Sequence, residues 1–239
     1  GLIPARGQVD GEERVALFCR MAEAVTATVE RVKKSDDVPK AVTHYLRSKN
    51  LAPSVRMGDD RRLKRMDWAS QKSLEVKLGR ADPADEVGVS HAFAAVAETG
   101  TVALPSGKDN PTTVNFVPDH HIIVIDAKDI AGDLETVISR LRRKYGRGDM
   151  PRLLNLITGP SRSGDIEQTM LLGAHGPRAL HLIVLRLVRV LPADIEEDQP
   201  PLRQPNAFDA FVVGHEEEEQ ASPLRRGRDG SVFEEKEEV

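Results

Sequence analysis

The segment His120-His121-Ile122-Ile123-Val124-Ile125-Asp126 decides the fold class of this 239-residue chain. Its four successive apolar residues predict a strand that is buried on both faces, as strands of parallel sheets are. A helical pattern follows over residues 130–145, with Gly146 as its end. The apolar run 153–158 predicts the next buried strand. This alternation of strand and helix predicts one open, three-layer α/β/α domain with a mostly parallel sheet.

The N-terminal part of the chain carries two helical patterns. Apolar residues recur at helical spacing over residues 11–34 and again over 38–49, and Ser35 is a start signal for the second helix. We therefore expect residues 1–50 to form a helical region that packs on the core.

Residues 51–192 are predicted to form the α/β domain itself. Besides the elements around residue 120, short strands are expected at 51–57 and around Val102. A last long strand, or a pair of strands, is expected at 180–191.

Charge is unevenly distributed along the chain. Residues 193–239 hold 14 acidic and 5 basic side chains, a net charge of −9, whereas residues 1–192 carry +5. An acidic segment with so few apolar residues is expected to be a largely disordered tail. The basic residues of the body alternate with acidic ones and only 4% of the chain is aromatic, which argues against a nucleic-acid partner.

Cys19 is the only cysteine, so this chain cannot form an internal disulfide or hold an iron–sulfur cluster by itself. The sequence offers no set of metal ligands at usable spacing, and we expect neither a metal nor a cofactor. It also has no apolar run long enough to cross a bilayer. A cytoplasmic protein without a membrane partner is the expectation.

Three polar clusters follow expected strands, and the first is Glu98-Thr99-Gly100-Thr101. A carboxylate beside two hydroxyls and the free N–H groups of a turn can hold a phosphate or a carboxylate. Glu98 is the candidate catalytic residue. A purely structural turn is the more frequent explanation of such residues.

The second cluster is the histidine pair at the start of the central strand. His120 and His121 could act as acid–base groups, since imidazole titrates near neutral pH. Neighbouring residues of a strand point to opposite faces, so at most one histidine serves a given site. We take His121 as the ligand-binding candidate, beside the more frequent role of a packed histidine.

The third cluster joins a strand end to an expected helix that begins near Asp165. Gly159, Ser161 and the first-turn residues Asp165 and Glu167 could form an anion site at a helix N-terminus, or Asp165 could simply cap the helix. His175 and Gly176 lie in a following turn and are further ligand-binding candidates. We expect all these residues to converge at the carboxyl edge of the sheet, with Arg162 or Arg178 facing the cleft.

In order and spacing the clusters resemble the LUD-domain family. The resemblance rests on Ala97–Thr101, Pro118–Ile122, Thr158–Glu167 and Gly173–His181, and it extends from about Val9 to Leu191. Position 163 is Ser where many relatives have Thr, which keeps a hydroxyl. The family's fold is similar to that of phosphosugar isomerases (NagB and RpiA) and CoA transferases.

The resemblance implies a role in the oxidation of L-lactate to pyruvate. Family members work with iron–sulfur partner proteins of the A-type and B-type, and a chain without ferredoxin motifs is similar to the C-type accessory protein. An accessory or ligand-binding protein that takes a small anion is therefore the main hypothesis. The alternative is an enzyme acting on a CoA ester, a phosphosugar or a folate through Glu98.

Overall fold

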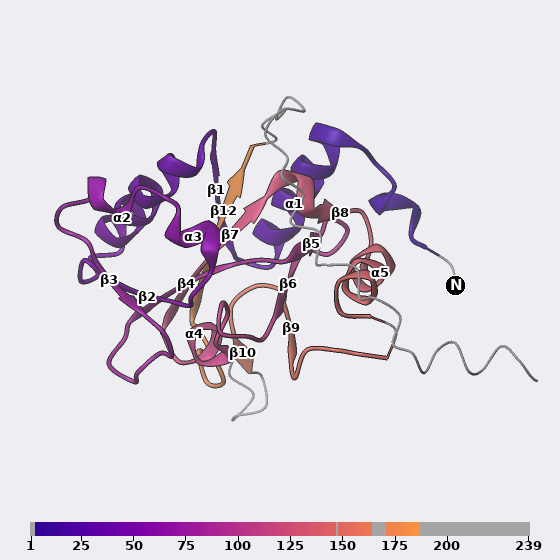
Figure 1. Ribbon diagram of the computed structural model, residues 1–239. Helices are drawn as coiled ribbons and strands as arrows, with labels where there is room; N and C mark the ends of the chain where they lie inside the picture. The colour runs from indigo at the N-terminus through magenta and orange to yellow at the C-terminus, as the bar shows by residue number, and fades with distance from the viewer. Residues whose placement is uncertain (1–2, 147, 164–170, 187–239) are drawn as a thin grey trace, which may run out of the picture. The chain divides into compact units, whose positions relative to one another are not determined.

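The computed structural model describes residues 3–146, 148–163 and 171–186 (Figure 1). Its centre is a sheet of six strands in the order β1-β12-β7-β4-β2-β3, and all neighbours in it are parallel. The strands are β1 (Thr28–Val32), β2 (Ser54–Met57), β3 (Glu75–Leu78), β4 (Val87–His91), β7 (His120–Asp126) and β12 (Ala179–Leu185). The mostly parallel α/β fold expected from residues 120–126 is confirmed.

One face of this sheet is covered by α2 (Val38–Ser48) and α3 (Arg61–Lys64). The side chains of Ile122 and Val124 point to this face and pack against buried residues of α2 such as Leu46. Burying a side chain of this size stabilises the fold by about 1.5–3 kcal/mol. The amphipathic pattern predicted for residues 38–49 thus anchors α2 on the sheet.

The opposite face, reached by Ile123 and Ile125, is covered by α1 (Gly11–Ala24) and by a second sheet. This smaller sheet has the order β8-β5-β6-β9. Its strands are β5 (Ala94–Val96), β6 (Thr101–Pro105), β8 (Ile130–Ala131) and β9 (Leu154–Ile157). Helix α5 (Leu134–Tyr145) packs on its outer side through Val137 and Leu141.

Several short elements complete the described part of the chain. Helix α4 (Thr112–Phe116) precedes β7, and β10 (Arg162–Ser163) pairs with β11 (Leu171–Leu172). The remaining turns of 3-10 helix are η1 (Ala5–Gly7), η2 (Ser35–Asp37), η3 (Trp68–Ser70) and η4 (Ala127–Asp129). No helix within the described ranges is long and apolar enough to cross a membrane.

The prediction of one helix over residues 11–34 is wrong in its second half. Helix α1 ends at Ala24, the chain turns at Thr26 with a φ of 67°, and Thr28–Val32 forms the edge strand β1. The β-branched residues Thr28, Val29 and Val32 suit a strand better than a helix. The first 50 residues are therefore not purely helical, because they also supply a strand of the main sheet.

The strand predicted at 153–158 exists but belongs to the other sheet. Strand β9 runs antiparallel to β6, and Leu156 is 44% exposed, so β9 is not a buried strand of the parallel sheet. An apolar run shows that a strand forms without showing which partner it pairs with. The helix expected near Asp165, residues 187–191 and the acidic tail lie outside the described residues.

Candidate functional site

A cavity of about 250 Å³ lies at the amino ends of β7 and β12, on the face of the parallel sheet that also carries α1 and the second sheet. It is bounded by α4, by the end of β9 and the turn after it, and by the turn that leads into β12. Its lining is Asn115, Phe116, His121, Leu156, Ile157, Thr158, Gly159, Pro160, Ser161, His175, Gly176, Pro177 and Leu180.

Five of the residues singled out from the sequence meet in this lining: His121, Gly159, Ser161, His175 and Gly176. They come from three separate segments, so their meeting does not follow from adjacency in the chain. They meet, however, at the amino ends of the parallel strands, and the expectation that they converge at the carboxyl edge is wrong. Candidates Asp165 and Glu167 lie outside the described residues.

Two backbone hydrogen bonds hold the turns of the cavity together. The Ser161 N–H donates to the Pro177 carbonyl over 2.8 Å, and the Gly173 N–H donates to the Ser161 carbonyl over 3.0 Å. Gly159 has a φ of 74°, and a Cβ on it would approach the Val25 carbonyl oxygen to 2.5 Å. Gly159 thus has a structural role in closing the turn against the end of α1.

The deepest polar groups of the cavity are connected through Ser90 of β4. The Ser90 hydroxyl donates to Asn115 Oδ1 over 2.8 Å and lies 3.0 Å from His121 Nε2. Both Asn115 and His121 are fully buried. Within the described part of the chain, no group hydrogen-bonds Asn115 Nδ2 or His121 Nδ1.

The protonation of His121 follows from these contacts. Burial lowers the pKa of His121 to about 3, so the ring is neutral at physiological pH. Because Ser90 gives its single hydrogen to Asn115, His121 Nε2 carries the ring proton and Nδ1 is a free acceptor. Reversing the whole chain of hydrogen bonds would exchange the roles, but one free donor and one free acceptor would still remain.

Neither of the arginines expected to face the cleft lines this cavity. Arg162 donates to the Val25 carbonyl and to Thr26 Oγ1, and Arg178 pairs with Asp119 over 3.3 Å. The cavity is therefore lined by neutral polar groups and histidine rather than by fixed cations.

Comparisons with known proteins agree with this layout. The sequence pattern of the LUD domain matches residues 15–185, which include every strand of both sheets. The chain belongs to the LUD-domain family. This confirms the resemblance noted in residues 97–181.

Related LUD proteins include two called lactate utilization protein C. The one from Shouchella clausii is 33% identical over 55% of this chain and 53% of its own length. The one from Bacillus subtilis is 32% identical over 49% of each chain. The matched region thus spans about half the length of these relatives.

A solved structure resembles the LUD domain described here. The crystal structure of a DUF162-family protein from Deinococcus radiodurans gives a TM-score of 0.53 at 20% identity, over 74% of this chain and 99% of that one. This likeness supports the fold alone.

The first sequence cluster of the LUD domain lies apart from the cavity. Glu98 does not line it; one of its oxygens is 3.9 Å from Arg6 Nε, and this atom has no hydrogen-bond partner among the described residues. Gly100 has a φ of 68° and packs against the backbone of α1 at Ala22. The sequence clusters therefore separate into a cavity and a turn that packs on α1.

The threonines of the first cluster approach the cavity indirectly. Thr99 and Thr101 share a hydrogen bond of 2.7 Å between their hydroxyls, and Thr101 makes another of 2.7 Å with Thr158, which lines the cavity. Their hydroxyls thus connect β6 to the residue that follows β9. Neither Thr99 nor Thr101 lines the cavity itself.

The carboxyl edge of the parallel sheet holds a different polar cluster. Asp60 caps α3 by accepting from the Arg62 and Leu63 N–H groups, and it pairs with the Arg62 guanidinium over 2.8 Å. His91, at the end of β4, contacts the Ala92 carbonyl at 3.0 Å and lies 3.7 Å from Asp126. Burial, followed by the nearby Arg62 charge, lowers the pKa of His91.

Sequence reasoning missed the importance of Asn115 and Ser90. Asn115 directly precedes the exposed Phe116 and Val117 but is itself fully buried. A buried Asn side chain needs hydrogen-bond partners, which makes it a candidate for a polar site. Ser90 interrupts a buried strand of small and apolar residues, which is the available signal. Among the described residues, no group of three or more His, Cys, Asp or Glu side chains could hold a metal ion.

Proposed function

We propose that this protein serves L-lactate utilisation as an accessory component that binds a small 2-hydroxy acid and works with iron–sulfur partner proteins of the A-type and B-type. Membership of the LUD family and relatives called lactate utilization protein C support the pathway. The observation that carries the ligand class is a pair of buried atoms that have no hydrogen-bond partner among the described residues, Asn115 Nδ2 and His121 Nδ1, in two side chains of the cavity lining.

A single hydroxyl group has both the acceptor and the donor that these two atoms lack. Its oxygen accepts from Asn115 Nδ2 while its hydrogen is donated to His121 Nδ1, and both protein atoms belong to side chains held by Ser90. Leaving such groups unpaired in a buried site costs about 1–3 kcal/mol each, so a ligand that pairs both is favoured. A ketone oxygen can only accept and would leave His121 Nδ1 unpaired.

The rest of the cavity fits the other parts of a small hydroxy acid. Phe116, Ile157 and Leu180 offer apolar surface to a methyl group. The carboxylate stays at the side of the exposed His175 and the half-exposed Ser161, where water also solvates it. In this arrangement the charge of the carboxylate stays in contact with water. Burying that charge without a partner would be costly.

The size of the cavity weighs against the alternative function. About 250 Å³ holds a three- or four-carbon acid but is smaller than the cavities that take drug-sized ligands, and a CoA ester is larger still. Glu98, the nucleophile in that alternative, does not line the cavity. The geometry therefore favours the accessory, ligand-binding role.

Reconstitution with the partner proteins tests the proposal. L-lactate-dependent reduction of a dye by the purified A-type and B-type proteins should rise when this chain is added, and the chain alone should give none. The Asn115→Leu variant should fail to stimulate, whereas Lys72→Gln, an exposed change far from the cavity lining, should behave as wild type. Equal rates with and without the chain, or oxidation by the chain alone, would contradict the accessory role.

A further inference from the structure

A second, larger hollow opens at the carboxyl ends of β2 and β3. This cleft has a volume of about 800 Å³ and lies between the residues after those strands, the turn after β6, the start of α4 and the residues before β9. Its lining includes Arg80, Lys108 and Arg152. In open α/β sheets, ligands bind outside the carboxyl ends of the strands.

The charges around this cleft are predominantly positive. Among the residues that the structure describes, Arg80 and Arg152 make no ion pair or hydrogen bond. Among the lining residues that the structure describes, Asp59 is the one acidic side chain, and its carboxylate lies 2.6 Å from Lys64 Nζ. Three basic residues thus line the cleft beside a carboxylate that already has a partner, which leaves a positive field for an anion.

The shape and the other groups of the lining indicate the kind of anion. A guanidinium group can donate two parallel hydrogen bonds to two oxygens of one phosphate. The Thr112 hydroxyl adds a further polar group to the lining. Pro111 and Leu153 present apolar surface in the same cleft, and Leu153 is 49% exposed. A volume of about 800 Å³ is in the range of sites for whole cofactors rather than for a single small ion.

We propose that this cationic cleft binds a phosphorylated, nucleotide-sized anion, with Arg80, Lys108 and Arg152 around the phosphates and Pro111 and Leu153 against the apolar part. The cleft is separate from the amino-end cavity. Pro111, Thr112 and Thr113 of the α4 region line the cleft, whereas Asn115 and Phe116 line the cavity. The proposal therefore does not depend on the binding of a hydroxy acid.

Calorimetric titration of the full chain with ATP as the probe tests this site. ATP should bind, and inorganic phosphate should bind at least tenfold more weakly because it lacks the apolar part and the additional charges. Arg80→Gln and Arg152→Gln should each weaken ATP binding by about tenfold, since each removes a charge-assisted contact. Binding should also weaken as salt rises from 50 to 300 mM, because the cations are exposed.

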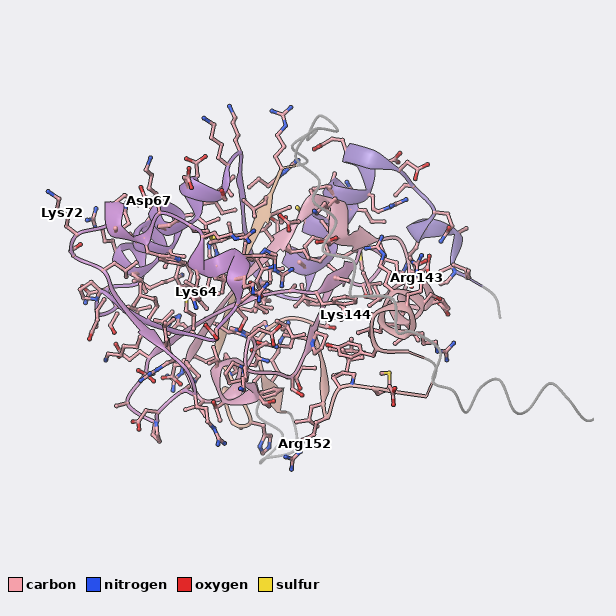
Figure 2. All side chains as sticks on the ribbon, in the orientation of Figure 1. Lys64, Asp67, Lys72, Arg143, Lys144 and Arg152 are labelled. Carbon is pink, nitrogen blue, oxygen red and sulfur yellow. The ribbon has the colours of Figure 1, made fainter. Side chains whose placement is uncertain are left out.

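Arg143→Gln is the matched control. Arg143 is an exposed arginine on α5 outside the cleft lining, and Figure 2 shows it well away from Arg152, which lies at the lower edge of the view. It should leave ATP binding unchanged. The proposal is overturned if ATP does not bind at millimolar concentration, if Arg143→Gln weakens binding as much as Arg152→Gln, or if Asn115→Leu abolishes it.

Discussion

Buried polar groups differ in their hydrogen-bond pairing between the two ends of the parallel strands. At the carboxyl edge, Asp60 has a guanidinium and two backbone N–H groups as partners, and His91 lies between a carbonyl and Asp126. At the amino edge, Asn115 and His121 share one serine, and each keeps an atom without a partner among the described residues.

The difference separates polar groups whose partners lie within the fold from polar groups that have an atom without a partner among the described residues. Buried polar atoms are nearly always paired in native proteins, so an unpaired atom in the wall of a cavity needs a separate explanation. The general rule that ligands bind at carboxyl ends pointed to the wrong edge for the cluster around His121 and His175. In this protein the two edges of the sheet differ in whether their buried polar atoms have hydrogen-bond partners, and this difference is not predicted by the sheet topology.

The largest expected effect is at the carboxyl edge. Asp60→Ala should lower the free energy of unfolding by about 3 kcal/mol, because it removes the cap of α3 and leaves Arg62 without its carboxylate. Urea unfolding at pH 7.5 measures this loss of unfolding free energy. Asp59→Ala, which removes the exposed neighbouring carboxylate, should leave the midpoint nearly unchanged. Equal effects of the two substitutions would show that the Asp60 pair does not stabilise the fold.

The next effect is a pH dependence at the amino edge. His121 has a pKa of about 3 when folded and about 6.5 when unfolded, so between these values the unfolded chain binds more protons and stability falls as pH falls. The stability that neutral His121 provides is complete above pH 6.5, and about 2 kcal/mol of it should be lost by pH 5. His121→Gln should lack this loss in unfolding experiments at pH 8 and pH 5. If the difference in unfolding free energy between wild type and His121→Gln is the same at both pH values, burial does not hold His121 neutral.

The smallest effect concerns the width of the cavity. A Cβ on Gly176 would lie 3.4 Å from Phe116 Cδ1 and 3.5 Å from Ser161 Cβ, so Gly176→Ala narrows the cavity without a severe clash. We expect little change in thermal stability. The binding free energy of 2-hydroxybutyrate should become less favourable by about 1 kcal/mol relative to that of L-lactate. Competition binding with the two acids measures this selectivity. An unchanged ratio would place the ligand elsewhere.

Much of the fold was predictable because its signals are local. The apolar run in β7, the amphipathic face of α2 and the glycine end of α5 each depend on neighbouring residues. Strand β1 was missed because Val25, Val29 and Val32 recur at a spacing that fits a helix. Its partner residues in β12 are 153 positions away in sequence.

The candidate site was predictable only in part. Turn residues such as Ser161 and His175 were recognisable from their glycine-rich surroundings. The role of Asn115 in helix α4 depends on a hydrogen bond from Ser90 of strand β4, which is 25 positions away in sequence. The edge of the sheet at which the residues meet likewise depends on β9 pairing in the second sheet rather than the first. No local pattern carries such long-range information.

Titration calorimetry with L-lactate, pyruvate and propionate, on the wild-type protein and on Asn115→Leu, tests the central claim most directly. Leu has a similar volume, and it removes both one unpaired donor and the acceptor of the Ser90 hydroxyl. Ser90 can then donate to His121 Nε2 instead, so the variant should stay folded, with its stability within about 2 kcal/mol of wild type. The account predicts that the wild-type protein binds L-lactate at least about tenfold more tightly than pyruvate or propionate, and that Asn115→Leu loses this preference. Equal affinity for the three acids, or a preference that survives in Asn115→Leu, would contradict it.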